Sequence, residues 1–141
     1  MAEQKIILKT RLILYHRGKI LLLKQTKPQG GNYTLVGGTI ESSEFARRAL
    51  IRESFEEAGI LLKEQDLRLV HVMHKMKKGE HRLIFYFKAI EWEGNLRARE
   101  KHKFKKAEWF DSTNLPENLT ETVAHVLELY RHGILYSEVW Q

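Results

Sequence analysis

Three glutamates in the middle of the chain, Glu53, Glu56 and Glu57, have the spacing that brings carboxylates together on a helix. Residues three and four positions apart lie on one helical face, so these side chains are expected to crowd one another. Crowded carboxylates repel unless a cation lies between them, and hard divalent ions such as Mg²⁺ or Mn²⁺ prefer oxygen ligands. The spacing therefore predicts a metal site on one face of a helix.

The residues around the three glutamates occur at regular offsets from them. Gly38 is separated by five residues from Glu44, and seven further residues separate Glu44 from the run Arg52-Glu53-Ser54-Phe55-Glu56-Glu57-Ala58-Gly59-Ile60. Two or three glutamates on a helix face usually form a solvated surface. Chance agreement at so many positions is improbable, so the pattern favours a functional site over a surface helix.

This arrangement resembles the signature of the Nudix hydrolases, which cleave a nucleoside diphosphate linked to a further group X, and of their MutT-like members. The likeness extends to residues 33–38 before the motif and 108–111 after it. It implies one domain over residues 1–141, with the Nudix α/β/α sandwich around a mixed β-sheet. Two positions depart from the family pattern: Val36 lies where proline is common, and Ser54 lies where an aliphatic residue is usual.

The resemblance also implies roles for individual residues. The expected metal ligands are three side chains and a backbone carbonyl: Glu53, Glu56, Glu57 and either Gly37 or Gly38. Arg52 and Glu44 match the family's supporting pair, in which the arginine orients carboxylates near the metal. The implied reaction is attack of water on a phosphorus of a pyrophosphate. Metal ions neutralise the phosphate oxygens, lower the pKa of the water and stabilise the leaving group.

A general base is expected as well, and its position varies in this family. Either Glu56 or Glu57 could serve as the base instead of a ligand. Outside the motif, Glu100 is the preferred candidate because it lies in a loop before a predicted strand. Glu80, at a predicted hairpin tip, is the second candidate. A solvated loop glutamate is an equally good interpretation of either residue.

Hydrophobic patterning predicts the elements that position these residues. Strands are expected over residues 6–8, 12–15, 19–24, 33–36, 68–76, 82–92 and 107–110. The first helix is expected to begin at residues 42–44 and to end at Gly59, and a second helix covers 120–132. The first helix carries two apolar stripes, which predict packing on two sides: Ala46, Ala49 and Leu50, and then Ile51, Phe55 and Ala58.

Composition limits the kinds of protein and of site. A chain of 141 residues is a typical domain length, and its zero cysteines exclude disulfides and thiolate metal sites. No apolar stretch approaches the roughly 20 residues of a membrane span. We therefore expect a cytoplasmic protein with no membrane partner, either a monomer or a homodimer. The apolar segment 134–141 is expected to pack on the domain or on a second subunit.

The net charge of +6 predicts an anionic partner. Basic residues concentrate in two segments, 75–82 and 97–106. These segments could rim an active site that binds polyphosphate, or they could contact RNA. No aromatic motif that reads RNA bases is present, so free nucleotides are the favoured partner.

Together these observations predict a Mg²⁺-dependent pyrophosphohydrolase, with Mn²⁺ as a possible substitute. Its expected substrate is a nucleoside triphosphate or another nucleoside diphosphate linked to X. One alternative is an enzyme that processes RNA 5′ ends or caps. The other alternative is a catalytically silent nucleotide-sensing module. The presence of every carboxylate of the motif argues against silence.

Overall fold

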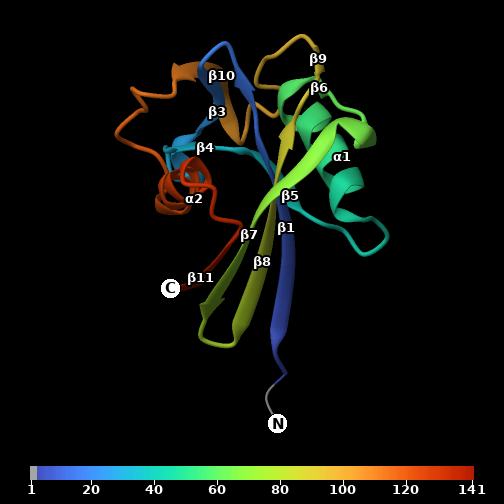
Figure 1. Ribbon diagram of the computed structural model, residues 1–141, viewed down its shortest axis with the longest axis vertical. Coiled ribbons are helices and arrows are strands. Elements are labelled where there is room, and N and C mark those ends of the chain that lie inside the picture. Colours follow the sequence, from blue (N-terminus) through green and yellow to red (C-terminus); the bar gives the residue numbers. More distant parts are fainter. Residues whose placement is uncertain (1–2) are drawn as a thin grey trace.

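A computed structural model describes residues 3–141 of the protein. Within them, a five-stranded sheet lies between two helices, α1 (Ala46–Ala58) and α2 (Glu121–Arg131) (Figure 1). The strands of this sheet are, in spatial order, β11 (Tyr136–Trp140), β7 (Leu67–Lys77), β8 (Glu80–Ala89), β1 (Lys5–Ile13) and β5 (Val36–Thr39). The sheet is mixed, because β1 is parallel to β8 and β11 is parallel to β7, whereas the other pairs are antiparallel. This is the α/β/α arrangement expected from the sequence.

A second sheet lies next to one end of the five-stranded sheet (Figure 1). It consists of β10 (Phe104–Asp111), β3 (Lys19–Gln25) and β2 (Tyr15–His16), with β4 (Tyr33–Thr34) paired to β3. A two-stranded pair, β6 (Ile60–Leu61) with β9 (Glu93–Gly94), follows the end of α1. Two short 3₁₀ turns complete the elements: Lys27–Gln29 and Glu64–Asp66.

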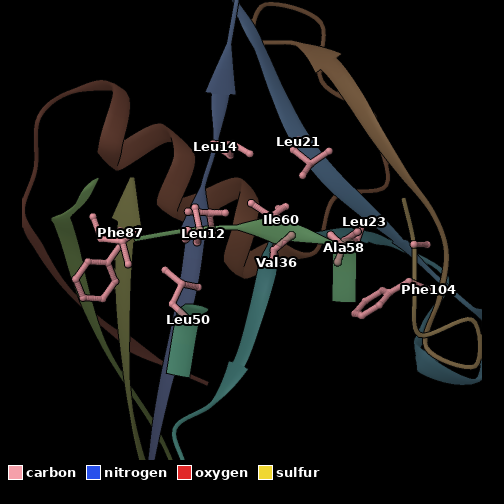
Figure 2. Packing of buried hydrophobic residues seen from close by; sticks show 13 residues of the cluster. Leu12, Leu14, Leu21, Leu23, Val36, Leu50, Ala58, Ile60, Phe87 and Phe104 are labelled. Carbon is pink, nitrogen blue, oxygen red and sulfur yellow. The ribbon is translucent and has the colours of Figure 1, made fainter. Parts of the chain in front are cut away.

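The two helices cover opposite faces of the five-stranded sheet, each over its own hydrophobic core. Leu50 of α1 points toward Leu12 and Phe87 of the sheet (Figure 2). On the other face, Val126 of α2 packs in one cluster with Ile13 of the same strand β1. Successive residues of a strand point to opposite faces, so the run through β1 sends one set of side chains to α1 and the other to α2.

The strands predicted over 19–24 and 68–76 match β3 and β7. The strand predicted over 33–36 is divided between β4 and β5, that over 82–92 ends at Ala89, and that over 107–110 begins earlier, at Phe104. The strands β6, β9 and β11 were not predicted, and two further boundaries differ. Residues 6–8 and 12–15, expected as separate strands, fall mostly within one continuous strand β1, because Lys9 and Arg11 keep its two-residue alternation. The helix does not begin at residues 42–44 but at Ala46, after Phe45. The predicted cap residues are unavailable because Glu44 instead accepts hydrogen bonds from Arg52 and from the backbone of the preceding turn.

The predicted helix ends are confirmed. Gly59 ends α1 in a left-handed conformation, with φ of 70°, and its N–H donates to the carbonyl of Phe55. Thr120 caps α2 through its side chain, which accepts a hydrogen bond from the backbone of Val123 at 3.3 Å. The segment 134–141 packs on the domain, where it supplies the edge strand β11. Within residues 3–141, neither helix has the length and apolarity needed to cross a membrane.

Candidate active site

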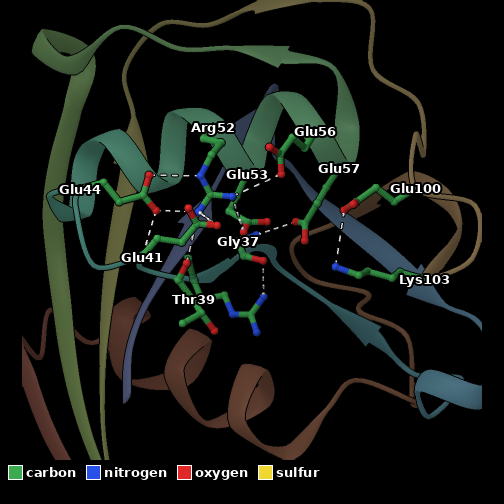
Figure 3. Close-up of polar contacts among 11 residues, drawn as sticks. Gly37, Thr39, Glu41, Glu44, Arg52, Glu53, Glu56, Glu57, Glu100 and Lys103 are labelled. Atoms are coloured by element: carbon green, nitrogen blue, oxygen red, sulfur yellow. Dashed lines mark hydrogen bonds and ion pairs between the residues drawn. The ribbon is translucent and has the colours of Figure 1, made fainter. Parts of the chain in front are cut away.

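The glycine pair of β5 brings the backbone of the sheet against the glutamates of α1 (Figure 3). The N–H of Gly37 donates to Oε1 of Glu57 at 2.9 Å. A Cβ at Gly38 would lie 2.7 Å from the carboxylate of Glu53, so any other residue there would have to displace that carboxylate. Gly37 has a φ of 141°, which also favours glycine. The two glycines therefore set the position of both carboxylates.

Arg52 fixes the outer side of this site. Its Nη2 and Nε donate to the two carboxylate oxygens of Glu44 at 2.6 and 3.1 Å, which is a bidentate pair. Its Nη1 donates to Glu53 at 3.0 Å and to Glu56 at 3.3 Å. The hydrogen bonds from Arg52 hold the pKa of Glu44 below its usual range, and those to Glu44 raise the pKa of Arg52. Arg52 and Glu44 thus form the supporting pair that the sequence predicts.

The structure brings together three of the predicted carboxylates. Oxygen atoms of Glu53, Glu57 and Glu100 all lie within 4.8 Å of one another. Glu56 is outside this group: its side chain is 47% exposed, and its carboxylate faces Arg52. Glu100 comes from the loop before β10, far from α1 in the sequence. Its carboxylate lies beside those of Glu53 and Glu57 of α1.

The nearby cations Arg52 and Lys103 do not fully compensate the negative charge of this cluster. The pKa of Glu57 is raised to about 8, mainly by burial. The charges of Glu53 and Glu100 act in the same direction, whereas the hydrogen bond from Gly37 and the charge of Arg11 oppose the shift. Oε1 of Glu100 is buried without a hydrogen-bond partner, and Lys103 Nζ is 3.9 Å from it. Such an atom costs about 1–3 kcal/mol unless something binds it. The donor set consists of hard oxygens and fits a divalent ion such as Mg²⁺.

A contact between the loop and the end of α1 positions Glu100. The backbone N–H of Arg99 donates to the carbonyl of Glu57 at 2.9 Å, and its Nη1 donates to the carbonyl of Phe55 at 2.8 Å. The guanidinium also lies 4.3 Å from the centre of the Phe55 ring. The prediction that Phe55 belongs to a buried stripe is therefore wrong: it is 47% exposed, and its ring and backbone bind the loop.

The remaining predicted positions lie as follows. Glu80 is at the far hairpin, where its carboxylate accepts from Arg82 at 2.6 Å and lies 3.9 Å from Lys5, so it does not join the three carboxylates. The carbonyl of Gly37, one of the two expected backbone ligands, accepts a hydrogen bond from Arg11 at 3.0 Å. Ser54, the unusual residue of the motif, is fully buried, and its hydroxyl has no hydrogen-bond partner.

Arg11 is a residue of the site that the sequence analysis did not identify. Its Nη1 donates to the carbonyls of Leu35 and Gly37, at 3.2 and 3.0 Å, and thereby holds the turn that carries the glycine pair. A signal was present in the sequence, since the polar run Lys9-Thr10-Arg11 interrupts an otherwise apolar strand.

Comparison with known proteins agrees with this geometry. A family model described as the NUDIX domain matches residues 9–130. The chain is 32% identical over 129 residues to the Nudix hydrolase YvcI of Bacillus subtilis, which covers 88% of this chain and 78% of the relative. It is 33% identical over 106 residues to an ADP-ribose pyrophosphatase of Methanocaldococcus jannaschii. That match covers 74% of this chain but only 62% of the relative, less than two thirds of its length.

A solved structure shows the same fold. The crystal structure of a MutT NUDIX hydrolase from Burkholderia pseudomallei superimposes with a TM-score of 0.79 at 29% identity. The match covers 89% of this chain and 98% of that one. The similarity therefore includes both sheets and both helices, and not the glutamate motif alone.

Proposed function

Because the chain belongs to the Nudix hydrolase family, we propose that it is a Mg²⁺-dependent pyrophosphohydrolase of small nucleotides. Its proposed substrate is a nucleoside triphosphate or another nucleoside diphosphate linked to X, and Mn²⁺ is a possible substitute for Mg²⁺. The observation that carries this proposal is the convergence of Glu53, Glu57 and Glu100, with a buried carboxylate oxygen that has no hydrogen-bond partner.

The residues around the carboxylate cluster have different roles in the proposed reaction. Glu53 and Glu57 would hold the ion, with the backbone at Gly37 or Gly38 as a further ligand, and Arg52 fixes the orientation of Glu53. When bound, a divalent ion neutralises phosphate charge and lowers the pKa of an attacking water. Glu56, outside the three-carboxylate group, would contribute through its contact with Arg52.

Proton transfer is assigned to Glu100. Water attacks a phosphorus of the anhydride, which forms one P–O bond and breaks the bridging P–O bond. The proton of the water passes to the carboxylate of Glu100, and the leaving phosphate departs with the bonding electron pair. Arg99 positions Glu100 for this role through its two hydrogen bonds to the end of α1. No covalent nucleophile is required.

Two features support a small nucleotide as the substrate. One relative that the chain resembles is named an ADP-ribose pyrophosphatase, and one similar solved structure is a MutT hydrolase.

The experiment is product release from a panel of nucleotides with Mg²⁺. We expect the wild type to release phosphate or pyrophosphate and the Glu53→Gln, Glu57→Gln double variant to lose at least about a hundredfold in kcat. Glu56→Gln is the matched control, since it removes a carboxylate outside the three-residue group, and it should retain more activity than Glu57→Gln. Unchanged turnover in the double variant would contradict the proposal.

A lack of turnover on every free nucleotide, with Mg²⁺ binding intact, would favour the two alternatives. Salt-sensitive RNA binding, with release of 5′ phosphates, would then identify an RNA-processing enzyme. Nucleotide binding without any hydrolysis would identify a sensing module.

A further inference from the structure

Three cations, Lys9, Arg11 and Lys75, lie on the face of the five-stranded sheet that α2 covers in part. Lys9 and Arg11 are alternate residues of β1 and so point to the same face, about 7 Å apart along the strand. Lys75 of β7 pairs directly with Arg82 of β8, which is level with Ile7 of β1. Neighbouring strands are about 4.8 Å apart, so the cations extend about 10 Å across the sheet.

None of the three cations has a carboxylate partner. Among residues 3–141, no carboxylate oxygen lies within ion-pair distance of Lys9, Arg11 or Lys75. The ammonium of Lys75 donates to the hydroxyl of Thr122 at 2.7 Å, and Arg11 donates to backbone carbonyls. Arg82 differs, because Glu80 pairs with it at 2.6 Å.

The surroundings of Lys9 and Lys75 disfavour the charged forms of both side chains. The pKa of Lys9 is lowered to about 8, mainly by burial; the charges of Arg11, Arg82 and Lys75 act in the same direction, and the charge of Glu53 opposes them. Lys75 is 7% exposed, and burial together with neighbouring cations lowers its pKa as well. Desolvated charges of one sign are costly unless an anion compensates them. The arrangement is explained if an anion binds there.

The three cations lie next to the carboxylates of the candidate active site, with Arg11 nearest to Glu57. Gly37 connects the two, since its N–H binds Glu57 and its carbonyl binds Arg11. From Arg11 the row leads across the sheet to Lys75. Lys75 also lines a pocket of about 400 Å³ between α2, β7 and β11, together with His125 and Trp140. A ligand held by the carboxylate centre would therefore continue along the cations and toward this pocket.

We propose that Lys9, Arg11 and Lys75 form an anion subsite for a phosphate group of the substrate that lies beyond the scissile anhydride. The enzyme then favours substrates with such a further phosphate over nucleoside diphosphates joined to an uncharged sugar. Charged hydrogen bonds to phosphate oxygens supply the preference. The part of this inference that concerns substrate turnover rests on the proposed function. The part that concerns anion binding does not, because binding can be measured without hydrolysis.

The first test measures anion binding without any metal. Inorganic tripolyphosphate is titrated into the protein in EDTA, and binding is followed by calorimetry and by the shift in Tm. We expect Lys9→Met and Lys75→Met to weaken binding about tenfold each. Lys19→Met, at an exposed position of β3, is the charge-matched control and should bind as the wild type does. Without ligand, Lys9→Met should raise Tm, because it removes a repelled and partly buried charge.

The second test compares two substrates with Mg²⁺ present. Lys9→Met and Lys75→Met should lower kcat/KM about tenfold for a nucleoside triphosphate and leave it nearly unchanged for a nucleoside diphosphate joined to a neutral sugar. Equal losses on both substrates would overturn the inference, as would tripolyphosphate binding that the substitutions do not affect. Tripolyphosphate binding that depends on Lys9, in a protein that hydrolyses no nucleotide, would support the subsite and refute the proposed function.

Discussion

Replacing Glu57 by glutamine should remove most of the pH dependence of stability that the metal-free site creates. Glutamine keeps the shape of the side chain, and its carbonyl oxygen can still accept the hydrogen bond from Gly37. Its amide nitrogen can donate to the carboxylates of Glu53 and Glu100, which lie within 4.8 Å of the Glu57 carboxylate in the wild type. The substitution therefore removes a buried charge without removing a hydrogen bond.

The magnitude follows from the pKa of Glu57, which burial raises from 4.5 to about 8. Between these values the folded protein keeps a proton that the unfolded chain has lost, so stability falls as pH rises and levels off above the folded pKa. One pKa unit corresponds to about 1.4 kcal/mol. Integrated from pH 5 to pH 8, the loss in the wild type is roughly 3–4 kcal/mol. In Glu57→Gln this contribution is absent.

The assay is urea denaturation of both proteins in EDTA at pH 5, 6, 7 and 8. The difference between the two curves isolates Glu57, because carboxyls with lowered pKa values, such as Glu44, act below this range and are present in both proteins. Addition of Mg²⁺ should flatten the wild-type curve, since the ion stabilises the ionised carboxylate. Equal slopes for the two metal-free proteins would refute the reasoning.

Three further substitutions test the parts that support the site. Arg52→Met should lower the free energy of unfolding by about 1–3 kcal/mol, and a double-mutant cycle with Glu44→Gln should show that the two effects are coupled. Gly38→Ala should weaken divalent-ion binding about 10- to 100-fold in calorimetry, with an unchanged circular dichroism spectrum, because its methyl group meets the Glu53 carboxylate. Arg99→Met should reduce kcat about tenfold with little change in Tm, because it releases the loop that carries the proposed base Glu100. An equal loss of kcat in Arg97→Met would argue against a positioning role for Arg99.

The sequence predicts the local part of the site well, because helix periodicity and glycine geometry depend on neighbouring residues. Gly59 ends α1 as predicted, and Glu53 and Glu57 face the sheet together. The spacing of the three glutamates does not show whether the helix buries the side of Glu56 or the side of Glu57. Glu56 and Glu57 are about 100° apart around the helix, and the seam through the buried Leu50 and Ser54 runs on the side of Glu57.

The long-range part of the site was harder to predict, because it depends on which segments the fold brings together. Glu100 was only one of two loop glutamates in the sequence, and the preference for it over Glu80 had no geometric basis. Its position depends on Arg99, which binds the end of a helix more than 40 residues earlier in the chain. The polar run Lys9-Thr10-Arg11 marks Arg11 in the sequence but does not reveal its partners, which are the carbonyls of Leu35 and Gly37.

The position of β1 between β8 and β5 has a consequence for the order in which the molecule assembles. Its parallel partner β8 lies more than half the chain length away in sequence, with Lys5 level with Glu80 and Ile13 level with Lys88. Pairing over such a separation requires closure of a long loop and is intrinsically slow. During synthesis, one edge of β1 therefore stays unpaired until β8 has been made. Until then this edge can associate with other chains. Glu100 emerges only after β8, so a newly made chain cannot complete its carboxylate cluster before β8 is available to pair with β1.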